Sequence, residues 1–349
     1  MSGKSIIYFG ISIAFLAVLS LAYLSYHPSE HGPTAAAILA QNQTGATATV
    51  KVSYAQSTLA LPMWVAEDQG YFKEENITVE GTSQLTLSLV TSSMLAGKAD
   101  VGVPISFIDA LAVENKQPGQ FKAFMVEAET LETNSTGILV RPNSTYSTIA
   151  DLKGKRVGHY PGLNSLTGGS WLLGKYFNIS EVTLVTVAPA AAVEALVSNQ
   201  VDALMVPQPT LIIAVNEGLA RDLPNSTNAY TLDPYPQAVC AFSSKFVEQN
   251  PQVAARFVKA MDEARAYIEA NPQGAMLILA NHTNMTVDQL RSGDPRTPWL
   301  SLALGNETFS GAFGNVSAVD AMQALADKYY ESGYVNGTVN MSNVTYVKK

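Results

Sequence analysis

The sequence predicts an α/β fold in two lobes, each a mixed, mostly parallel sheet flanked by helices, after an N-terminal transmembrane helix. Short β-branched or apolar runs alternate with amphipathic segments of about ten residues, which is typical of strand–helix–strand crossover units. This alternation occurs in two successive series. About 300 residues remain after the N-terminal region, which is enough for two lobes by the usual size of a domain.

The N-terminal region predicts a membrane anchor over residues 1–26. Lys4 precedes an uncharged apolar run at residues 6–24, and roughly 19 residues are enough to cross a bilayer as a helix. A cleaved signal has a shorter apolar core, although the alanines at 35–37 leave that alternative open. Residues 27–49, with Pro, Gly, Ala and Thr, predict a flexible stalk. The folded part is therefore expected at the cell surface, on the extracellular side of the membrane.

The first series of elements opens the first lobe. Its apolar runs predict strands, and the segments between them have the periodicity of helices. In chain order we expect strands at residues 50–54, 77–80, 99–103 and 121–126, and helices at 63–72, 85–95 and 105–114. Because short strands separated by helices favour parallel pairing, this lobe is expected to be α/β.

The second series predicts a second α/β unit. Its expected elements are a strand at 138–141, a helical turn and a strand within 149–158, a helix at 165–177, a strand at 183–187, a helix at 190–199, a strand at 202–206 and a helix at 209–217. Gly154 ends the helical turn, because glycine accepts the left-handed conformation that closes a helix.

The remaining residues predict that the chain returns to the first lobe. A strand at 237–242 and helices at 253–258 and 318–330 have no place in a finished second lobe. We therefore expect lobe 1 to comprise residues 50–138 and 232–349, and lobe 2 to comprise 139–231. The two crossings are expected near 137–142 and near 226–233.

Composition and charge exclude some classes of function. Charged residues make up 14% of the chain and hydrophobic residues 47%, so uncharged polar side chains must cover a complete core. The net charge of -8 argues against nucleic-acid binding, which needs a basic face. Cys240 is the only cysteine, so no disulfide forms within the chain and no lipid-modified cysteine follows the apolar run.

Most asparagines lie in Asn-X-Ser/Thr sites for N-glycosylation. Turn-forming asparagines beside Ser or Thr explain some of these sites but not their excess. We therefore predict a heavily glycosylated surface protein, which favours an archaeal source. The candidate sites are Asn42, Asn76, Asn134, Asn143, Asn178, Asn225, Asn281, Asn284, Asn306, Asn315, Asn336, Asn340 and Asn343.

Five segments resemble one known family when taken together in chain order. They are residues 61–81, 94–102, 151–158, 195–209 and 250–274. With them, roughly residues 50–335 resemble the substrate-binding component of ABC importers of the nitrate, sulfonate and taurine type, which has the type II periplasmic-binding-protein fold. The resemblance implies an extracellular receptor that captures a small polar or anionic solute. It also implies a partner permease with a separate ATPase subunit, and no cofactor.

The candidate ligand-binding residues are the polar residues that follow the predicted strands. Ligands of open α/β sheets collect beyond the carboxyl ends of the strands, where helix N-termini present unpaired N–H groups. Each candidate could instead cap a helix or a turn. The candidates are Gln56, Ser57, Thr58, Ser83, Gln84, Ser106, Tyr160, Ser165, Thr167 and Gln208.

The sequence does not predict the charge of the solute. The candidate loops contain no Arg or Lys, and an acidic segment with Glu127, Glu129 and Glu132 follows the fourth strand. If these carboxylates face the cleft, an amino acid or a thiamine-type pyrimidine is a plausible ligand. We expect instead a solvated acidic loop. Trp64 and Tyr235 are expected in the core rather than against a ligand.

Catalysis is not expected. His159 and His282 are far apart in the chain and do not form a metal-binding motif, and there is no phosphate loop. The resembled fold family includes a thiamine-pyrimidine synthase with a cysteine-rich motif, which a chain with one cysteine lacks. We therefore predict no catalytic residue, no metal and no cofactor. The rival hypothesis is a glycosylated structural protein that reuses the fold in a cell-surface filament.

Overall fold

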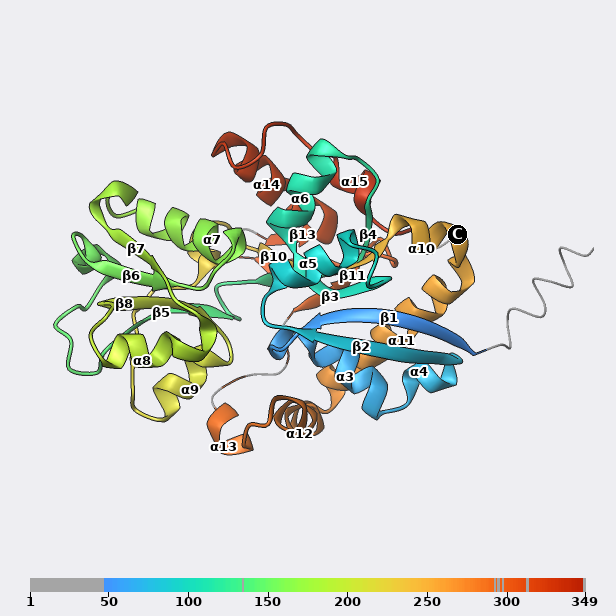
Figure 1. Ribbon diagram of the computed structural model, residues 1–349, viewed down its shortest axis with the longest axis horizontal. Helices are drawn as coiled ribbons and strands as arrows, with labels where there is room; N and C mark the ends of the chain where they lie inside the picture. Colours follow the sequence, from blue (N-terminus) through green and yellow to red (C-terminus); the bar gives the residue numbers. More distant parts are fainter. Residues whose placement is uncertain are drawn as a thin grey trace, which may run out of the picture. The chain divides into compact units, whose positions relative to one another are not determined.

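Two lobes, each built around its own sheet, make up the described part of the chain (Figure 1). The computed structural model describes residues 47–347, except 134, 292, 294, 295, 297, 312 and 313. Within these residues a six-stranded sheet has the order β11-β4-β10-β3-β1-β2, and a five-stranded sheet has the order β7-β6-β8-β5-β9. We call the lobes around them the large lobe and the small lobe. The predicted two-lobed α/β fold is confirmed.

The sheet of the large lobe is mixed. Its strands are β1 (Ala48–Ala55), β2 (Ile77–Gln84), β3 (Val101–Ser106), β4 (Phe121–Glu129), β10 (Tyr235–Ser243) and β11 (Trp299–Ser301). β1 is parallel to β2 and β3, whereas β10 is antiparallel to β3 and β4, and β11 is antiparallel to β4. The chain enters β10 from the other lobe, at the edge where β3 ends, so β10 must run in the opposite direction. β1, β2, β3 and β4 therefore run in one direction and β10 and β11 in the other, so the sheet is mixed, as predicted.

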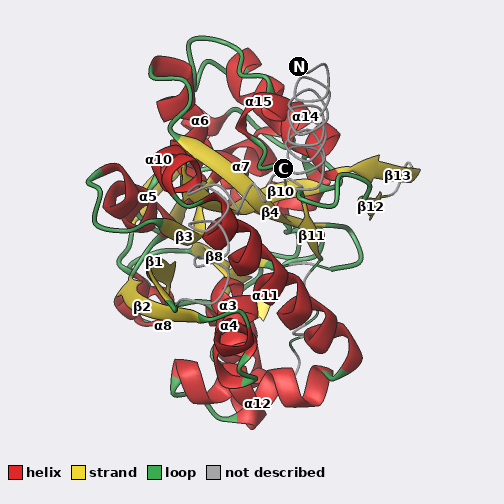
Figure 2. Ribbon diagram, turned by 90° about the vertical axis from the view of Figure 1, so that its right-hand side faces the viewer, coloured by secondary structure: helices red, strands yellow, loops and turns green. Residues whose placement is uncertain are grey.

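Helices cover both faces of this sheet. One face carries α3 (Leu61–Asp68), α4 (Tyr71–Glu74), α11 (Pro251–Ala270) and α12 (Pro272–Thr283), and the other carries α5 (Leu87–Leu95), α6 (Phe107–Lys116) and α14 (Ala318–Glu331). Figure 2 shows the long helix α11 lying across its face. The single helix predicted at 63–72 is two helices, because Gly70 takes a φ of 83° and separates α3 from α4.

The sheet of the small lobe is also mixed. Its strands are β5 (Thr136–Val140), β6 (Arg156–His159), β7 (Thr183–Thr186), β8 (Ala203–Pro207) and β9 (Arg221–Asp222), and its helices are α7 (Leu163–Gly174), α8 (Ala192–Val197) and α9 (Thr210–Asn216). β6 is parallel to β7 and β8, whereas β5 is antiparallel to β8 and β9. Buried Leu, Ile, Val and Ala side chains form a core on each face.

Two crossings connect the lobes. The first runs from the end of β4 at Glu129 to the start of β5 at Thr136, and the second runs from the end of β9 at Asp222 to the start of β10 at Tyr235. Contacts between helices also join the lobes elsewhere, among them one between α6 and α7. α13 (Val287–Leu290) packs on α9, and Trp171 of α7 lies with its ring centroid 4.8 Å from that of Tyr329 in α14.

The chain ends in short elements around the large lobe. They are α10 (Ser244–Gln249), the hairpin β12 (Thr308–Gly311) and β13 (Gly314–Ser317), and α15 (Met341–Val344). β1 begins at Ala48, so the last residues of the predicted stalk belong to a strand. The predicted anchor at 1–26 lies outside the described residues. Within them, no helix is both long and apolar enough to span a membrane.

Candidate functional site

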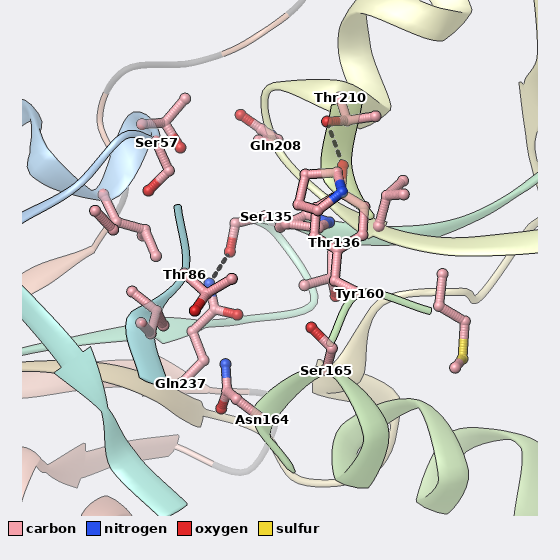
Figure 3. Close-up of a pocket in the computed structure, with 18 of the residues that line it drawn as sticks. Ser57, Thr86, Ser135, Thr136, Tyr160, Asn164, Ser165, Gln208, Thr210 and Gln237 are labelled. Atoms are coloured by element: carbon pink, nitrogen blue, oxygen red, sulfur yellow. Dashed lines mark hydrogen bonds between the residues drawn. The ribbon is translucent and has the colours of Figure 1, made fainter. Parts of the chain in front are cut away.

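A cavity of about 250 Å³ lies between the two lobes. Its wall comes from both sheets and from both crossings, and it combines apolar side chains with hydroxyl and amide groups (Figure 3). A cavity of this size suits a small molecule rather than a macromolecule.

The carboxyl ends of strands supply much of the wall. β1 leads into Gln56 and Ser57, and β2 leads into the start of α5 near Thr86. In the small lobe, β6 leads into Tyr160, and β8 leads into Gln208 before α9 begins. Because parallel strands end at one edge of a sheet and helices begin there, polar groups from both lobes face one space.

Six of the predicted ligand-binding residues line this cavity. They are Gln56, Ser57, Thr58, Tyr160, Ser165 and Gln208. The Tyr160 hydroxyl lies 2.7 Å from Thr210 Oγ1, and burial raises the pKa of Tyr160. This pair ties the end of β6 to the start of α9 in the small lobe. Whether these six residues contact a solute stays a prediction.

The other four predicted residues lie outside the cavity wall. Ser83 donates its hydroxyl to Gln56 Oε1 at 2.9 Å, and Gln84 accepts the Gln56 N–H on its carbonyl. Ser106 is fully buried and caps α6 through Asp109 N, at 3.4 Å. Thr167 is also fully buried, and its hydroxyl donates to the carbonyl of Leu163 at 2.9 Å. These side chains support the structure, which is the alternative that Ser, Thr and Gln offer at strand and helix ends.

The sequence interpretation missed polar residues at the crossings and at the start of α5. They are Thr86, Ser88, Ser135, Thr136, Asn228 and Gln237. The predicted residues all follow strand ends, whereas the floor of the cavity is formed where the chain passes between the lobes. One signal was visible: Gln237 is a lone amide in the apolar run of β10, and it is 4% exposed. A buried polar side chain in such a run needs a partner or a ligand.

Two carboxyl groups lie directly behind this floor. Glu127 and Glu129 are fully buried in β4, so the prediction of a solvated acidic loop is wrong for both. Ser135 Oγ donates to Glu129 Oε1 at 3.0 Å and lies 3.3 Å from Glu127 Oε1. Burial raises the pKa of Glu127 well above its ordinary value and also raises the pKa of Glu129. Glu132 is exposed, as expected.

The other oxygen of Glu129 receives hydrogen bonds from residues next to both crossings. Its Oε2 accepts hydrogen bonds from Thr227 Oγ1 at 2.6 Å, from Asn228 N at 3.1 Å and from Thr136 Oγ1 at 2.9 Å. We call Glu129 and its four donors, Ser135, Thr136, Thr227 and Asn228, the crossing network. It joins the end of β4 to both crossings.

Four aromatic and histidine residues that the sequence singles out pack within the protein and do not line the cavity. Trp64 is 1% exposed and its ring stacks on that of His282, with centroids 5.0 Å apart. Tyr235 is 1% exposed, and His159 Nδ1 lies 2.7 Å from the carbonyl of Tyr160. The expectation that Trp64 and Tyr235 belong to the core is confirmed. In the described residues no cluster of three or more His, Cys, Asp or Glu side chains is placed to hold a metal ion.

Comparison with known proteins identifies the family. The sequence profile described as NMT1/THI5 like matches residues 57–275, which is more than half of the chain. The chain belongs to this family. BAB2_1146 of Brucella abortus (strain 2308), which carries the name of a binding protein, is 28% identical over 163 residues, or 44% of this chain and 49% of that protein. The chain thus spans about half the length of the curated relatives that it matches first.

Other comparisons find a likeness to a solved binding protein and to an enzyme. The alkanesulfonate-binding protein SsuA from Xanthomonas axonopodis pv. citri, bound to MOPS, has a TM-score of 0.69 at 17% identity, covering 87% of this chain and 99% of that chain. A 4-amino-5-hydroxymethyl-2-methylpyrimidine phosphate synthase of Candida albicans (strain WO-1) is 25% identical over 229 residues, or 62% of this chain and 65% of that enzyme. The predicted binding-protein fold is confirmed by the likeness to the solved SsuA structure.

Proposed function

We propose that this NMT1/THI5-like protein is the extracellular solute-binding receptor of an ABC importer. The observation that supports this function best is the cavity between the lobes, which receives residues from both sheets and from both crossings. A small solute in this cavity contacts both lobes at once. Such contacts stabilise the closed arrangement relative to an open one, which is the requirement for a ligand to drive closure.

Delivery of the solute requires other components. The sequence has no phosphate-loop motif, so ATP hydrolysis belongs to a separate subunit of the importer. The permease recognises the closed lobes, and the predicted N-terminal helix keeps the receptor at the cell surface. A cleaved N-terminus would instead release it.

The proposed solutes are small and polar. Sulfonates, nitrate and taurine-like molecules come first, because the family resemblance includes importers of this kind. An amino acid or a thiamine-type pyrimidine is the second candidate, supported by Glu127 and Glu129 behind the cavity floor. Both groups of solutes fit the mixture of hydroxyl, amide and apolar groups in the wall.

A thermal-shift screen tests the proposed function. A molecule that binds only the folded state raises its apparent stability. The full chain is screened with sulfonates, nitrate, amino acids and pyrimidines, and we expect at least one class to raise the melting temperature. Failure of every class, with a lysozyme and inhibitor pair as the positive control, would contradict solute binding.

Binding rather than catalysis is the proposed activity, although a relative is a synthase by name. Among the described residues, no acidic, basic or cysteine side chain lines the cavity. Cys240 is fully buried in β10, and burial raises the pKa of its thiol well above the ordinary value. Mass spectrometry of a ligand recovered from the complex tests this point, because a chemically altered ligand would contradict it.

Surface glycosylation belongs to the same proposal. Every described asparagine of the candidate sites is exposed, so a glycan can be attached without unfolding. Asn42 and Asn134 lie outside the described residues. Mass spectrometry of native protein is expected to find glycans, and unmodified asparagines throughout would contradict the proposal. A filament in electron micrographs, together with a cavity that binds nothing, would favour the structural rival.

A further inference from the structure

We propose that the solute meets Gln237 with an N–H donor group and carries no negative charge at that end. This inference rests on the proposed function and narrows the class of solute. It follows from the direction of a chain of hydrogen bonds that begins at the buried carboxyl group of Glu129 and ends at the cavity. Each step of that chain is set by which groups can donate and which can only accept.

The first step is that Glu129 accepts hydrogen bonds from all of its neighbours in the crossing network. Glu129 is fully buried in β4 and receives hydrogen bonds on both oxygens, from Ser135 on Oε1 and from three groups of the crossing network on Oε2. These hydrogen bonds stabilise the ionised form and oppose the rise in the pKa of Glu129 that burial causes. A carboxylate has no proton to donate. Ser135 must therefore use the single proton of its hydroxyl toward this carboxyl group.

The second step fixes the orientation of the Gln237 amide group. The proton of Ser135 is already used, so its oxygen can only accept from Gln237. Gln237 Nε2 lies 2.5 Å from Ser135 Oγ and donates to it. This bond directs the nitrogen of the amide toward Ser135 and the carbonyl oxygen toward the side of the cavity that holds Tyr160 and Ser165 (Figure 3). Gln237 therefore presents an acceptor to the solute, and a solute that donates there satisfies it.

The third step concerns charge. Among the described residues, no Lys, Arg or His side chain lines the cavity. Glu127 and Glu129 lie one residue behind the floor, because Ser135 contacts both of them and also lines the cavity. An anionic group against Gln237 would face an acceptor oxygen, and no cation in the described cavity wall would offset its charge, which is unfavourable in a buried site.

The opposite wall of the cavity, at the start of α7, contacts the other end of the solute. Gly162 caps α7 without a side chain, so the first N–H groups of this helix, near Asn164 and Ser165, are available to an acceptor on the solute. The cavity thus has an acceptor wall at Gln237 and a donor wall at α7. A zwitterion or a neutral amide matches both walls, whereas a simple anion matches one.

Two pairs of probes test this inference by isothermal titration of the full chain. In each pair the members have similar size, but only the first carries an N–H donor, and the second carries one more unit of net negative charge: taurine against propane-1-sulfonate, and benzamide against benzoate. We expect the N–H member of a pair to bind about tenfold more tightly, because the other member leaves a buried acceptor unpaired. Equal or tighter binding of propane-1-sulfonate or benzoate would overturn the inference.

A matched pair of variants assigns the preference to Gln237. Gln237→Met removes the amide at nearly constant size, and we expect it to reduce the N–H preference to within about twofold. Gln200→Met, at an exposed glutamine of the small lobe, is the control and is expected to keep the full preference. A preference that survives Gln237→Met would overturn the assignment.

The two proposals fail in different ways. If the broad thermal-shift screen finds ligands only among molecules without an N–H donor, such as nitrate, this inference is overturned and the proposed function stands. If no probe and no class of solute binds, the proposed function is overturned and the inference falls with it.

Discussion

The lobes are held together differently at the crossings and at the contact between α9 and α13. At the crossings, Glu129 is fully buried and bonded to residues of both segments. At the α9–α13 contact, Gln289 Nε2 donates to Glu217 Oε1 at 3.0 Å on an exposed surface, and Asn216 Nδ2 donates to the carbonyl of Gln289 at 2.8 Å. Buried Leu290 packs beside Ile212 there.

This difference indicates which contact gives way when the lobes open. Breaking the crossing network would leave buried donors and a buried carboxyl group without partners, which is costly. Separating α13 from α9 exposes the apolar contact of Leu290 and Ile212 but leaves no buried charge without a partner, and water can replace the surface hydrogen bonds. We therefore infer that the lobes rotate about the crossings and part at the α9–α13 contact.

The largest expected effect comes from breaking the crossing network. Glu129→Ala removes the acceptor of four donors and leaves them buried, so we expect the free energy of unfolding to fall by about 3 kcal/mol. Denaturation in urea measures it. Glu132→Ala, on the exposed side of the same segment, is the control and should change little. A similar small change in both variants would contradict the claim that the crossing network is costly to break.

The next prediction tests whether both walls of the cavity close on the solute. Ser57 lies in the large lobe and Ser165 in the small lobe, and both line the cavity. Replacing either with Trp overfills this space, so we expect the affinity for a ligand found in the screen to fall by about 100-fold. The unfolding of the ligand-free protein should not change.

Ser198→Trp, at an exposed site of the small lobe, serves as the control for the added indole. Unchanged affinity in both cavity variants would show that the solute binds elsewhere.

A third prediction concerns pH at the second crossing. Burial raises the pKa of Asp222 from 3.8 to about 6, although Ser226 donates to its carboxyl group at 2.7 Å. Between these two pH values the folded protein binds a proton that the unfolded chain has released. The stability from this group is therefore complete below about pH 4 and is lost as the pH rises through 6.

The matched variant isolates this contribution. Relative to Asp222→Asn, the free energy of unfolding of the wild type is expected to fall by on the order of 2 kcal/mol between pH 4 and pH 7. Asp288→Asn, at an exposed site of α13, controls for the loss of a charge. A wild-type curve parallel to that of Asp222→Asn would contradict the prediction.

The smallest expected effect is at the α9–α13 contact. Gln289→Ala removes one exposed hydrogen bond across the contact, to Glu217, and also the acceptor that Thr286 N uses at the start of α13. The bond to Thr286 lies within α13 and is present whether the lobes are open or closed, so we expect a loss of about 0.5 kcal/mol in the closed state and about a twofold weaker affinity. Titration of a ligand from the screen measures it, with Gln200→Ala as the control. A large loss of affinity would contradict the inference that the α9–α13 contact is weak and that the lobes part there.

Prediction from the sequence succeeded where the signal is local. The strand at 77–80 and the helix at 85–95 correspond to β2 and α5, because apolar periodicity is set by nearby residues. The helix predicted at 63–72 was too long, because the left-handed turn at Gly70 was not recognised. Ser57 and Ser165 were found in the cavity wall because strand ends and helix starts are visible in the sequence.

Prediction failed where distant segments meet. Gln237 and Ser135 are 102 positions apart, and their hydrogen bond exists because β10 lies beside β4. Glu129 looks like a surface residue in the sequence, and the four hydrogen bonds of the crossing network explain its burial. Neither pairing has a periodic signal, since it depends on the order of strands in the sheet.

The sequence by itself determined that this protein has two α/β lobes and resembles a family of binding proteins, since strands, helix ends and family segments are local patterns. The tertiary structure alone decided the chemistry of the cavity floor. Packing β10 antiparallel to β4 places Gln237, Ser135 and the buried carboxyl groups together. The direction of their hydrogen bonds follows from that contact, because a donor or acceptor role is fixed only when its partner is in place.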